Sequence, residues 1–519
     1  MFHRRFLLIV VFIALCIGFF RLGHVTLFDV DEAVFSQATN EMLQSGDWIT
    51  PTYNGVNRYD KPILFYWLMA ASYKAFGVNE FGARFPSAAA ALALAVAIFL
   101  TARRFRGDKS ALNASLAFTL SIYFLVYSHA AVTDMALTLF ISLSLFSFYL
   151  STAPERQGRR YLYGFYFFSA LAFLTKGLIG IVFPFGIAAI YMGITEGRSG
   201  IGKVFSVKGA VVFLAVAAPW YVAEYRANGR EFIEQFFIKH HFKRYTGVIS
   251  GHRGPVYYYI LTLLIGLFPW IAFLPAGAVS AVKEKKGLGM FALIWFSFVF
   301  VFFSFATTKL PNYILPALPA AALLISSGMP EADEKRRKYP YIFIAVIAAA
   351  LGALFVIARG YLLKAGIADS DWVFAAAAFM AAIGIFSLYA ALRGKAFAGV
   401  ASPLMIAFLL LLAVKPLPIA NDYLQGALHE YSLYAKRELP ADERIITYGI
   451  NKPSIVFYSG HKVISVQERR DVEDILRRNG PVIAIAKEKD MDFFSGMGLD
   501  LVRKENNYVL FERKKGYNN

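Results

Sequence analysis

The chain has 519 residues, of which 58% are hydrophobic and only 17% are charged. A soluble globular protein has about one quarter charged residues, so this composition excludes an ordinary soluble domain. The formal net charge is +18. The basic residues lie in short loops between apolar runs, which favours the positive-inside bias of a membrane protein over nucleic-acid binding.

Apolar runs long enough to cross a bilayer recur along the sequence. A helix needs roughly 20 residues to span the hydrocarbon core, and continuous rather than alternating apolar runs indicate helices instead of barrel strands. We therefore predict an all-α polytopic membrane protein with about 13 transmembrane helices. The predicted spans are residues 6–27, 84–102, 110–128, 135–152, 161–175, 178–194, 209–224, 256–280, 289–306, 313–328, 340–358, 372–391 and 399–416.

The first run resembles a signal peptide, but no small-residue cleavage site follows it, so we interpret it as an uncleaved span. It contains Cys16, the single cysteine of the chain, which excludes an intramolecular disulfide and a cysteine metal site. Basic clusters fall on alternate connections, and these connections are predicted to be cytoplasmic. The clusters include Arg4 and Arg5, Arg103 to Arg106, Lys283 to Lys286, and Lys335 to Lys338.

Three segments on the opposite, outer side are too long to be simple connectors: residues 28–83, residues 225–255, and everything after about residue 420. We predict two domains, a transmembrane catalytic domain (1–420) that includes the first two segments, and a small α/β domain (421–519). In the latter, the pattern predicts strands at 444–448, 481–486 and 508–511 and a helix at 472–479.

Three acidic residues lie close together where the first span leaves the membrane: Asp29, Asp31 and Glu32. From Asp31 onward, apolar residues recur at helical spacing, which predicts an amphipathic helix in the membrane interface with Asp29 or Asp31 capping its start. Three acids exceed what capping needs. We therefore predict a functional role for one of them, with Asp31 as the first candidate.

Two bases follow in the same loop, Arg58 and Lys61, with Asp60 between them. Arginine offers a planar fork of donors and lysine a mobile point charge, so both could bind a phosphate. Bases at a membrane surface also commonly extend toward lipid headgroups. This segment alone does not decide between phosphate binding and extension toward lipid headgroups.

Isolated polar groups occur in three other outer turns. Asp134 begins a predicted span, Lys176 ends one, and Lys309 and Tyr313 flank a proline between two spans. Ionisable groups in such places are costly unless they are paired, which makes functional use a fair default. Asp134 could equally be a simple N-cap. Several bases from separate loops opposite a group of acids predict a pocket for a phosphorylated substrate.

The second outer segment contains the adjacent residues His240 and His241 among several bases. Neighbouring residues on a helix point apart, so this pair is weak evidence for a metal. A metal site at His241 or His240 would need completion by Asp60 or Glu32, and we expect none. The bases, which include Arg244, fit anion binding better.

At this point the sequence resembles a known family, the bacterial GT-C glycosyltransferases that transfer aminoarabinose to lipid A, relatives of the protein O-mannosyltransferases. The resemblance covers roughly residues 20–330. It rests on motifs in the family's order: Asp29-x-Asp31-Glu32, Gly46-Asp47-Trp48, Asp60-Lys61-Pro62, Thr133-Asp134, Thr175-Lys176-Gly177, Pro219-Trp220-Tyr221, Arg244-Tyr245 and Lys309-Leu310-Pro311-x-Tyr313.

The resemblance implies a GT-C fold in the bacterial inner membrane and a polyprenyl (undecaprenyl) phosphate sugar as donor, used on the periplasmic side. The implied acceptor is lipid A or a similar periplasmic molecule, with 4-amino-4-deoxy-L-arabinose as the candidate sugar. No cofactor or nucleic acid is implied.

For the site, the resemblance implies that Lys61, Arg244, Lys309 and Tyr313 bind the donor phosphate, with Asp31 and Asp134 near the sugar and the acceptor. The sequence departs from the family's Glu-Lys-Pro at Asp60, and from its His-Glu-His at residues 239–241. A metal at those positions is therefore not expected.

We expect direct displacement at the anomeric carbon, with inversion. Cationic groups would stabilise the leaving phosphate, and Asp31 or Asp134 would be the general base if the acceptor is a hydroxyl. If the acceptor is a lipid A phosphate, the carboxylate would mainly orient the sugar. The non-enzyme alternative is a transporter of lipid-linked sugars, which predicts ionisable residues in mid-membrane.

Overall fold

The computed structural model describes residues 2–152, 158–236, 253–329, 338–393, 397–477 and 480–513. The chain forms two compact units. The first comprises Met1–Phe20, Tyr59–Phe65 and Phe85–Pro416, and the second comprises Arg21–Arg58, Tyr66–Arg84 and Leu417–Asn519.

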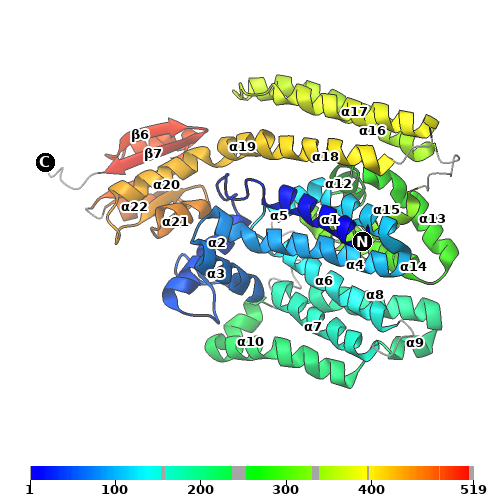
Figure 1. The fold of residues 1–519 in the computed structure, drawn as a ribbon. Coiled ribbons are helices and arrows are strands. Elements are labelled where there is room, and N and C mark those ends of the chain that lie inside the picture. The colour runs from blue at the N-terminus through cyan, green and yellow to red at the C-terminus, as the bar shows by residue number, and fades with distance from the viewer. Residues whose placement is uncertain are drawn as a thin grey trace. The chain divides into compact units, whose positions relative to one another are not determined.

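Helices dominate the first unit (Figure 1), and the predicted polytopic membrane fold is confirmed. Eight helices in the described residues are long and apolar enough to cross a membrane, and a bent pair would make nine. The eight are α4 (Glu80–Thr119), α6 (Thr133–Ser151), α8 (Ile179–Glu196), α10 (Val207–Ile233), α14 (Leu288–Phe305), α16 (Tyr339–Lys364), α17 (Trp372–Arg393) and α18 (Phe397–Val414).

The bent pair joins Tyr258–Gly266 to Trp270–Glu284 at an angle of 113°. The count of eight includes only helices of 18 residues or more in the described ranges, and α4 contains two helices that meet at Gly107 (φ 81°), within the predicted break between spans 84–102 and 110–128. The predicted span 110–128 is divided, because α4 ends at Thr119 and the next helix starts at Ile122. The remaining elements are α1 (Phe2–Phe19), α5 (Ile122–Ser128), α7 (Gly158–Lys176), α9 (Arg198–Gly202), α12 (Tyr258–Gly266), η2 (Trp270–Phe273), α13 (Leu274–Glu284), η3 (Pro311–Ala317) and α15 (Leu318–Gly328).

Helix α10 runs further than predicted. The sequence placed a long outer loop from residue 225, but the helix continues to Ile233. Gly229 lies inside it with φ 58° and ψ −133°, a conformation that favours glycine. Beyond this break, Phe232 packs against Trp220 with ring centroids 5.8 Å apart.

Small and hydroxyl-bearing side chains allow the helices of the first unit to approach closely. Ser144 of α6 donates to the Phe165 carbonyl of α7 at 2.8 Å. A Cβ atom on Gly277 of α13 would lie 1.8 Å from the carbonyl oxygen of Leu324 in α15, so only glycine fits there. Such contacts are the usual basis of helix association in membranes.

The second unit contains a mixed five-stranded sheet with the strand order β4-β3-β5-β7-β6. β3 is parallel to β4 and β5, and β7 is antiparallel to β5 and β6. The strands are β3 (Ile445–Tyr448), β4 (Val463–Val466), β5 (Val482–Lys487), β6 (Asp500–Glu505) and β7 (Tyr508–Arg513). The predicted C-terminal α/β domain and its three strands are thus confirmed, while β4 and β6 were not predicted.

Helices flank the sheet of the second unit. One apolar cluster joins the strands to α20 and α21, and a second joins them to α22 and α23. Residues of the first outer segment belong to the same unit and include a short hairpin. The other elements of the unit are α2 (Asp31–Ser45), β1 (Thr52–Tyr53), β2 (Val56–Asn57), α3 (Leu64–Phe76, in part), α19 (Pro416–Asn421, in part), η4 (Asp422–Gly426), α20 (Ala427–Glu438), α21 (Pro453–Ser459), α22 (Arg469–Leu476), η5 (Glu488–Asp490) and α23 (Met491–Ser495).

We expect His429 of α20 to make the stability of the second unit dependent on pH. Its ring packs edge-on against Tyr458 at 4.4 Å, and burial lowers the pKa of His429 although Glu80 and Glu430 oppose the shift. The fold therefore prefers the neutral ring. Its contribution to stability is complete above the ordinary pKa of about 6.5 and is lost as the pH falls through the lower folded-state value.

We expect the midpoint of thermal unfolding to fall on acidification below about pH 6.5, and to fall less in His429→Gln. Thermal melts of both proteins between pH 8 and pH 5 measure this difference. Equal slopes in the two proteins would show that His429 is not the titrating group.

Candidate active site

Asp134 and Lys176 form an ion pair in the first unit. Asp134 lies in the first turn of α6 and Lys176 is the last residue of α7, so the pairing of these helices brings the two ends together. The Lys176 Nζ atom lies 2.6 Å from Asp134 Oδ1, with 15% and 7% of the side chains exposed. An acid at a helix N-terminus and a base at a helix C-terminus are also favoured by the helix dipoles.

The prediction of Asp134 at a helix start is confirmed, but the capping alternative is wrong. Val132 is the N-cap residue of α6 and makes no side-chain cap bond. The Asp134 carboxylate bonds the lysine instead. Both side chains of this pair are largely buried.

Tyr313 lies beside this pair. Lys176 Nζ is 5.5 Å from the centroid of its ring, and the ring packs on Phe303 at 5.2 Å. Within the described residues, Asp134 is the only hydrogen-bond partner of the Lys176 ammonium. An ammonium has three N–H donors, so two of them can bind a ligand.

Lys309 was predicted to bind the donor phosphate, but its ammonium is fully used inside the protein. Nζ donates to the carbonyl oxygens of Phe303 at 2.9 Å, Ser304 at 2.6 Å and Ala306 at 2.6 Å. These carbonyls lie at the C-terminal end of α14, where carbonyls run out of intrahelical donors, although the Phe303 carbonyl also accepts from the Ala306 amide at 3.2 Å. Burial also lowers the pKa of Lys309. We therefore correct its role to a C-terminal cap of α14.

Lys309→Met is expected to lower the thermal stability of the protein and to leave the KM for the donor unchanged. Each buried carbonyl without a partner costs about 1–3 kcal/mol. Thermal melts and donor titrations of the variant measure the two effects. Lys286→Met, at an exposed position before α14, is the matched control. A large rise in KM without loss of stability would contradict the capping role.

Asp60 and Lys61 lie together in the segment Tyr59–Phe65 of the first unit. Both are partly buried, and Lys61 Nζ donates to the Asp60 carbonyl at 3.1 Å. Arg58 belongs to the second unit. Its Nε donates to the Tyr66 hydroxyl at 3.2 Å, and its guanidinium lies 5.8 Å from the Phe35 ring.

The three acids of the first loop have different environments. Glu32 is buried and forms a two-pronged ion pair with Arg84, at 3.0 Å from Nε and 2.9 Å from Nη2. Asp29 accepts hydrogen bonds from Ser454. Asp31 alone is exposed, with no hydrogen bond or ion pair to any part of the chain that the structure describes.

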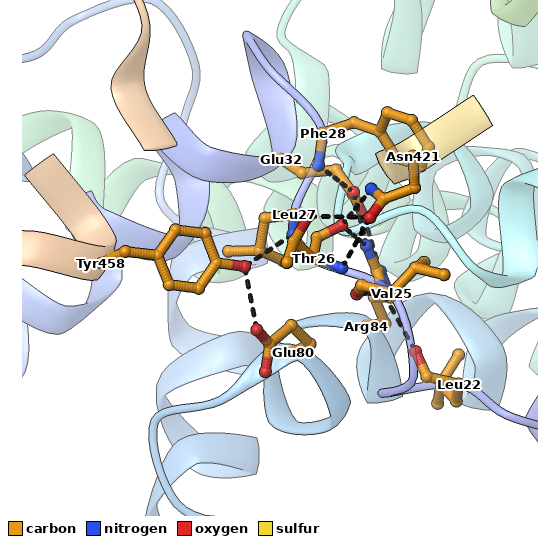
Figure 2. Close-up of polar contacts among 10 residues, drawn as sticks. All are labelled: Leu22, Val25, Thr26, Leu27, Phe28, Glu32, Glu80, Arg84, Asn421 and Tyr458. Carbon is orange, nitrogen blue, oxygen red and sulfur yellow. Dashed lines mark hydrogen bonds and ion pairs between the residues drawn. The ribbon is translucent and has the colours of Figure 1, made fainter. Parts of the chain in front are cut away.

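Arg84 organises the chain around Glu32 (Figure 2). Besides the carboxylate, its guanidinium donates to the carbonyls of Leu22 at 3.2 Å, Val25 at 2.7 Å and Thr26 at 2.9 Å. Charge-assisted, two-pronged pairs of this kind are among the strongest hydrogen bonds in proteins. The Glu32 carboxylate is thereby committed to structure, which corrects its predicted place among the catalytic candidates.

Helix α2 differs from prediction in two respects. Its N-cap is Val30 without a side-chain cap bond, so neither Asp29 nor Asp31 caps it. Residues 32–39 are buried on all sides, so its first turns lie inside the unit and not flat in the membrane interface. Helix α21 of the same unit packs against α2 and contributes to this burial.

Arg244 and His241 lie outside the described residues, as does the departure at residues 239–241. Arg253 follows the gap and forms a β-bridge with Thr308. The sequence analysis missed Arg84 and its partners Asn421 and Tyr458. A guanidinium at the start of an apolar run was the available signal for Arg84, whereas the other two carry no local signal.

The chain is similar to known proteins. A family model described as dolichyl-phosphate-mannose-protein mannosyltransferase matches residues 60–222. That range contains the Asp60-Lys61 segment and the Asp134–Lys176 pair.

Curated relatives match over more of the chain. An undecaprenyl phosphate-alpha-4-amino-4-deoxy-L-arabinose arabinosyl transferase of Proteus mirabilis is 30% identical over 390 residues, covering 72% of this chain and 70% of that protein. The chain belongs to this transferase family. A transferase of the same name from Shewanella sediminis is 31% identical over 353 residues, which are 65% of this chain and 63% of its own length.

Solved structures show the same fold over nearly the whole chain. The aminoarabinose transferase ArnT of Cupriavidus metallidurans, bound to undecaprenyl phosphate, has a TM-score of 0.82 at 22% identity and covers 97% of both chains. An Archaeoglobus fulgidus oligosaccharyltransferase has a TM-score of 0.57 at 11% identity, covering 96% of this chain and 70% of its own. The predicted GT-C fold is thus confirmed for this family member.

Proposed function

We propose that the protein moves a sugar, with 4-amino-4-deoxy-L-arabinose as the candidate, from undecaprenyl phosphate to lipid A or a similar acceptor. The family membership supports this reaction. The observation that carries it is the buried Asp134–Lys176 pair, because it holds an ammonium with two spare donors beside Tyr313. Such a group suits a phosphate ester.

The reaction is a displacement at the anomeric carbon with inversion. The bond between that carbon and the phosphate oxygen breaks, and undecaprenyl phosphate leaves with the electron pair. The acceptor oxygen forms the new bond. Lys176 stabilises the charge that develops on the leaving phosphate, a type of contribution that is usually the largest single one. Asp134 orients the ammonium through their bond of 2.6 Å.

Asp31 is the general base if the acceptor is a hydroxyl, since it is the acid of the first loop that is exposed and unpaired among the described residues. If the acceptor is a lipid A phosphate, Asp31 instead orients the sugar. Lys61, Arg58, Tyr313 and Arg244 remain proposed donor-phosphate contacts.

The chemistry is proposed to occur on the periplasmic side of the inner membrane. Under the positive-inside bias, the basic clusters mark the cytoplasmic side, and the turns with Asp134 and Lys176 fall opposite to them. No cofactor enters the proposed reaction.

The test uses purified protein in liposomes with undecaprenyl phosphate-aminoarabinose and lipid A. Mass spectrometry should find lipid A with added aminoarabinose and an equal amount of free undecaprenyl phosphate. If the donor crosses the bilayer unchanged and no sugar reaches an acceptor, the protein is a transporter of lipid-linked sugars and the proposal fails.

A further inference from the structure

Residues 26–29, which precede Val30 and helix α2, lie outside helices and strands, yet later parts of the second unit bind several of their polar groups. Thr26 is held by Asn421 at the end of α19. Asn421 Oδ1 accepts from the Thr26 amide at 3.1 Å and its hydroxyl at 2.8 Å, and Nδ2 donates to the Thr26 carbonyl at 2.9 Å. The Asn421 side chain thus bonds both the backbone amide and the backbone carbonyl of Thr26.

The next residue is held from helix α21. The amide of Leu27 donates to the Tyr458 hydroxyl at 2.7 Å, and that hydroxyl in turn donates to Glu80 at 2.9 Å (Figure 2). Tyr458 is 8% exposed. A buried hydroxyl that accepts one bond and donates another is fixed in position.

Asp29 is held at the start of the same helix. Its carboxylate accepts from the Ser454 amide at 2.8 Å and from the Ser454 hydroxyl at 2.7 Å. When the side-chain amide of Gln425 is placed with its nitrogen facing the Asp29 carboxylate, that nitrogen donates to Asp29 Oδ2 at 2.8 Å. The Gln425 side-chain oxygen then accepts from the Asp29 backbone amide at 3.2 Å. Burial raises the pKa of Asp29, and the Ser454 bonds oppose that shift.

These contacts, together with the Arg84–Glu32 pair, hold Asp29 and Glu32, which lie two residues before and one residue after the exposed Asp31. We propose that Asn421, Ser454 and Tyr458 are positioning residues for the sugar transfer: the C-terminal α/β domain orients the Asp31 carboxylate by clamping residues 26–29. The inference rests on the proposed function. It gives that domain a part in the reaction without a contact to substrate.

The physical reason is preorganisation. A catalytic carboxylate must be held close to its productive position, and a misplacement of about 1 Å can cost about 10²-fold in rate. Removing a clamp bond lets the start of α2 move while the donor phosphate contacts stay intact. We therefore expect kcat to fall and the KM for the lipid-linked donor to remain unchanged.

The test compares Ser454→Ala, Asn421→Ala and Tyr458→Phe with wild type. Each is expected to lower kcat about 10-fold to 100-fold with no change in donor KM. Ser454→Thr keeps the hydroxyl and should restore most of the rate. If the variants only reduce the amount of active protein, kcat will fall and Ser454→Thr will not restore it. That result would overturn the inference.

Asn54→Ala is the matched control. Asn54 also joins the first loop to the sheet, since Nδ2 donates to the Val463 carbonyl at 2.8 Å and Oδ1 accepts from the Val463 amide at 3.0 Å. It follows α2 instead of preceding it, so its loss removes two comparable bonds without freeing residues 26–29. We expect its kcat to stay near wild type.

Amide hydrogen exchange provides a readout that does not need activity. Residues 26–33 should exchange faster in the clamp variants than in wild type, and at the wild-type rate in Asn54→Ala. If wild type transfers no sugar but exchange changes as expected, the proposed function fails and the clamp stands as structure alone. If wild type transfers sugar but the clamp variants match Asn54→Ala in rate and exchange, only the clamp is refuted.

Discussion

Replacing Asp31 with asparagine is expected to lower the rate of sugar transfer about 10²-fold to 10⁴-fold, the range that a general base contributes. Asparagine has the same shape but cannot accept the proton of an acceptor hydroxyl. Because Asp31 is exposed and has no ion pair within the described residues, thermal stability should not change. Initial rates with purified protein measure the effect.

Asp442→Asn provides the control for Asp31→Asn, because Asp442 is an exposed acid of the same unit. It should transfer sugar at the wild-type rate. Full activity in Asp31→Asn would remove Asp31 from the mechanism. If only the KM for the donor rises and kcat is unchanged, Asp31 takes part in sugar binding instead of proton transfer.

Arg84→Ala is expected to destabilise the second unit by about 3–5 kcal/mol, the usual effect of removing one partner of a buried ion pair. Glu32 would keep a buried charge without its partner, and the carbonyls of residues 22, 25 and 26 would each lose a hydrogen bond. Equilibrium unfolding in mixed detergent micelles measures the difference from wild type.

Arg84→Ala combined with Glu32→Ala separates the two causes. The double variant carries no unpaired carboxylate, so it should recover part of the lost stability, while the carbonyls still lack their donor. If the double variant is no more stable than Arg84→Ala, the charge of Glu32 is not the source of the penalty. If Arg84→Ala unfolds like wild type, the pair is not structural.

The sequence predicted the fold well where local pattern decides it. Long continuous apolar runs marked the membrane helices, and short apolar runs marked β3, β5 and β7. An apolar run does not reveal where a helix breaks, so the sequence did not predict the break between α4 and α5 inside the expected span 110–128. It missed β4 and β6, where exposed residues interrupt the pattern.

The sequence predicted individual residues of the candidate site, but it did not predict which of them bond to each other. Asp134 and Lys176 stood out as isolated charges at predicted helix ends, and the structure joins them. Lys309 stood out for the same reason and caps a helix, since charge alone does not tell a ligand contact from a carbonyl contact. The clamp was not predictable, because Asn421 and Tyr458 lie about 400 residues from their partners.

The most direct test of the account compares Lys176→Met with Lys309→Met in sugar transfer from undecaprenyl phosphate-aminoarabinose, with rates corrected for the folded fraction. We expect a loss of about 10²-fold to 10³-fold in rate for Lys176→Met, the usual effect of removing one charge-stabilising donor. Lys309→Met should stay within a few-fold of wild type. The opposite order, with Lys309 essential and Lys176 dispensable, would contradict the assignment of the phosphate contact to the Asp134–Lys176 pair.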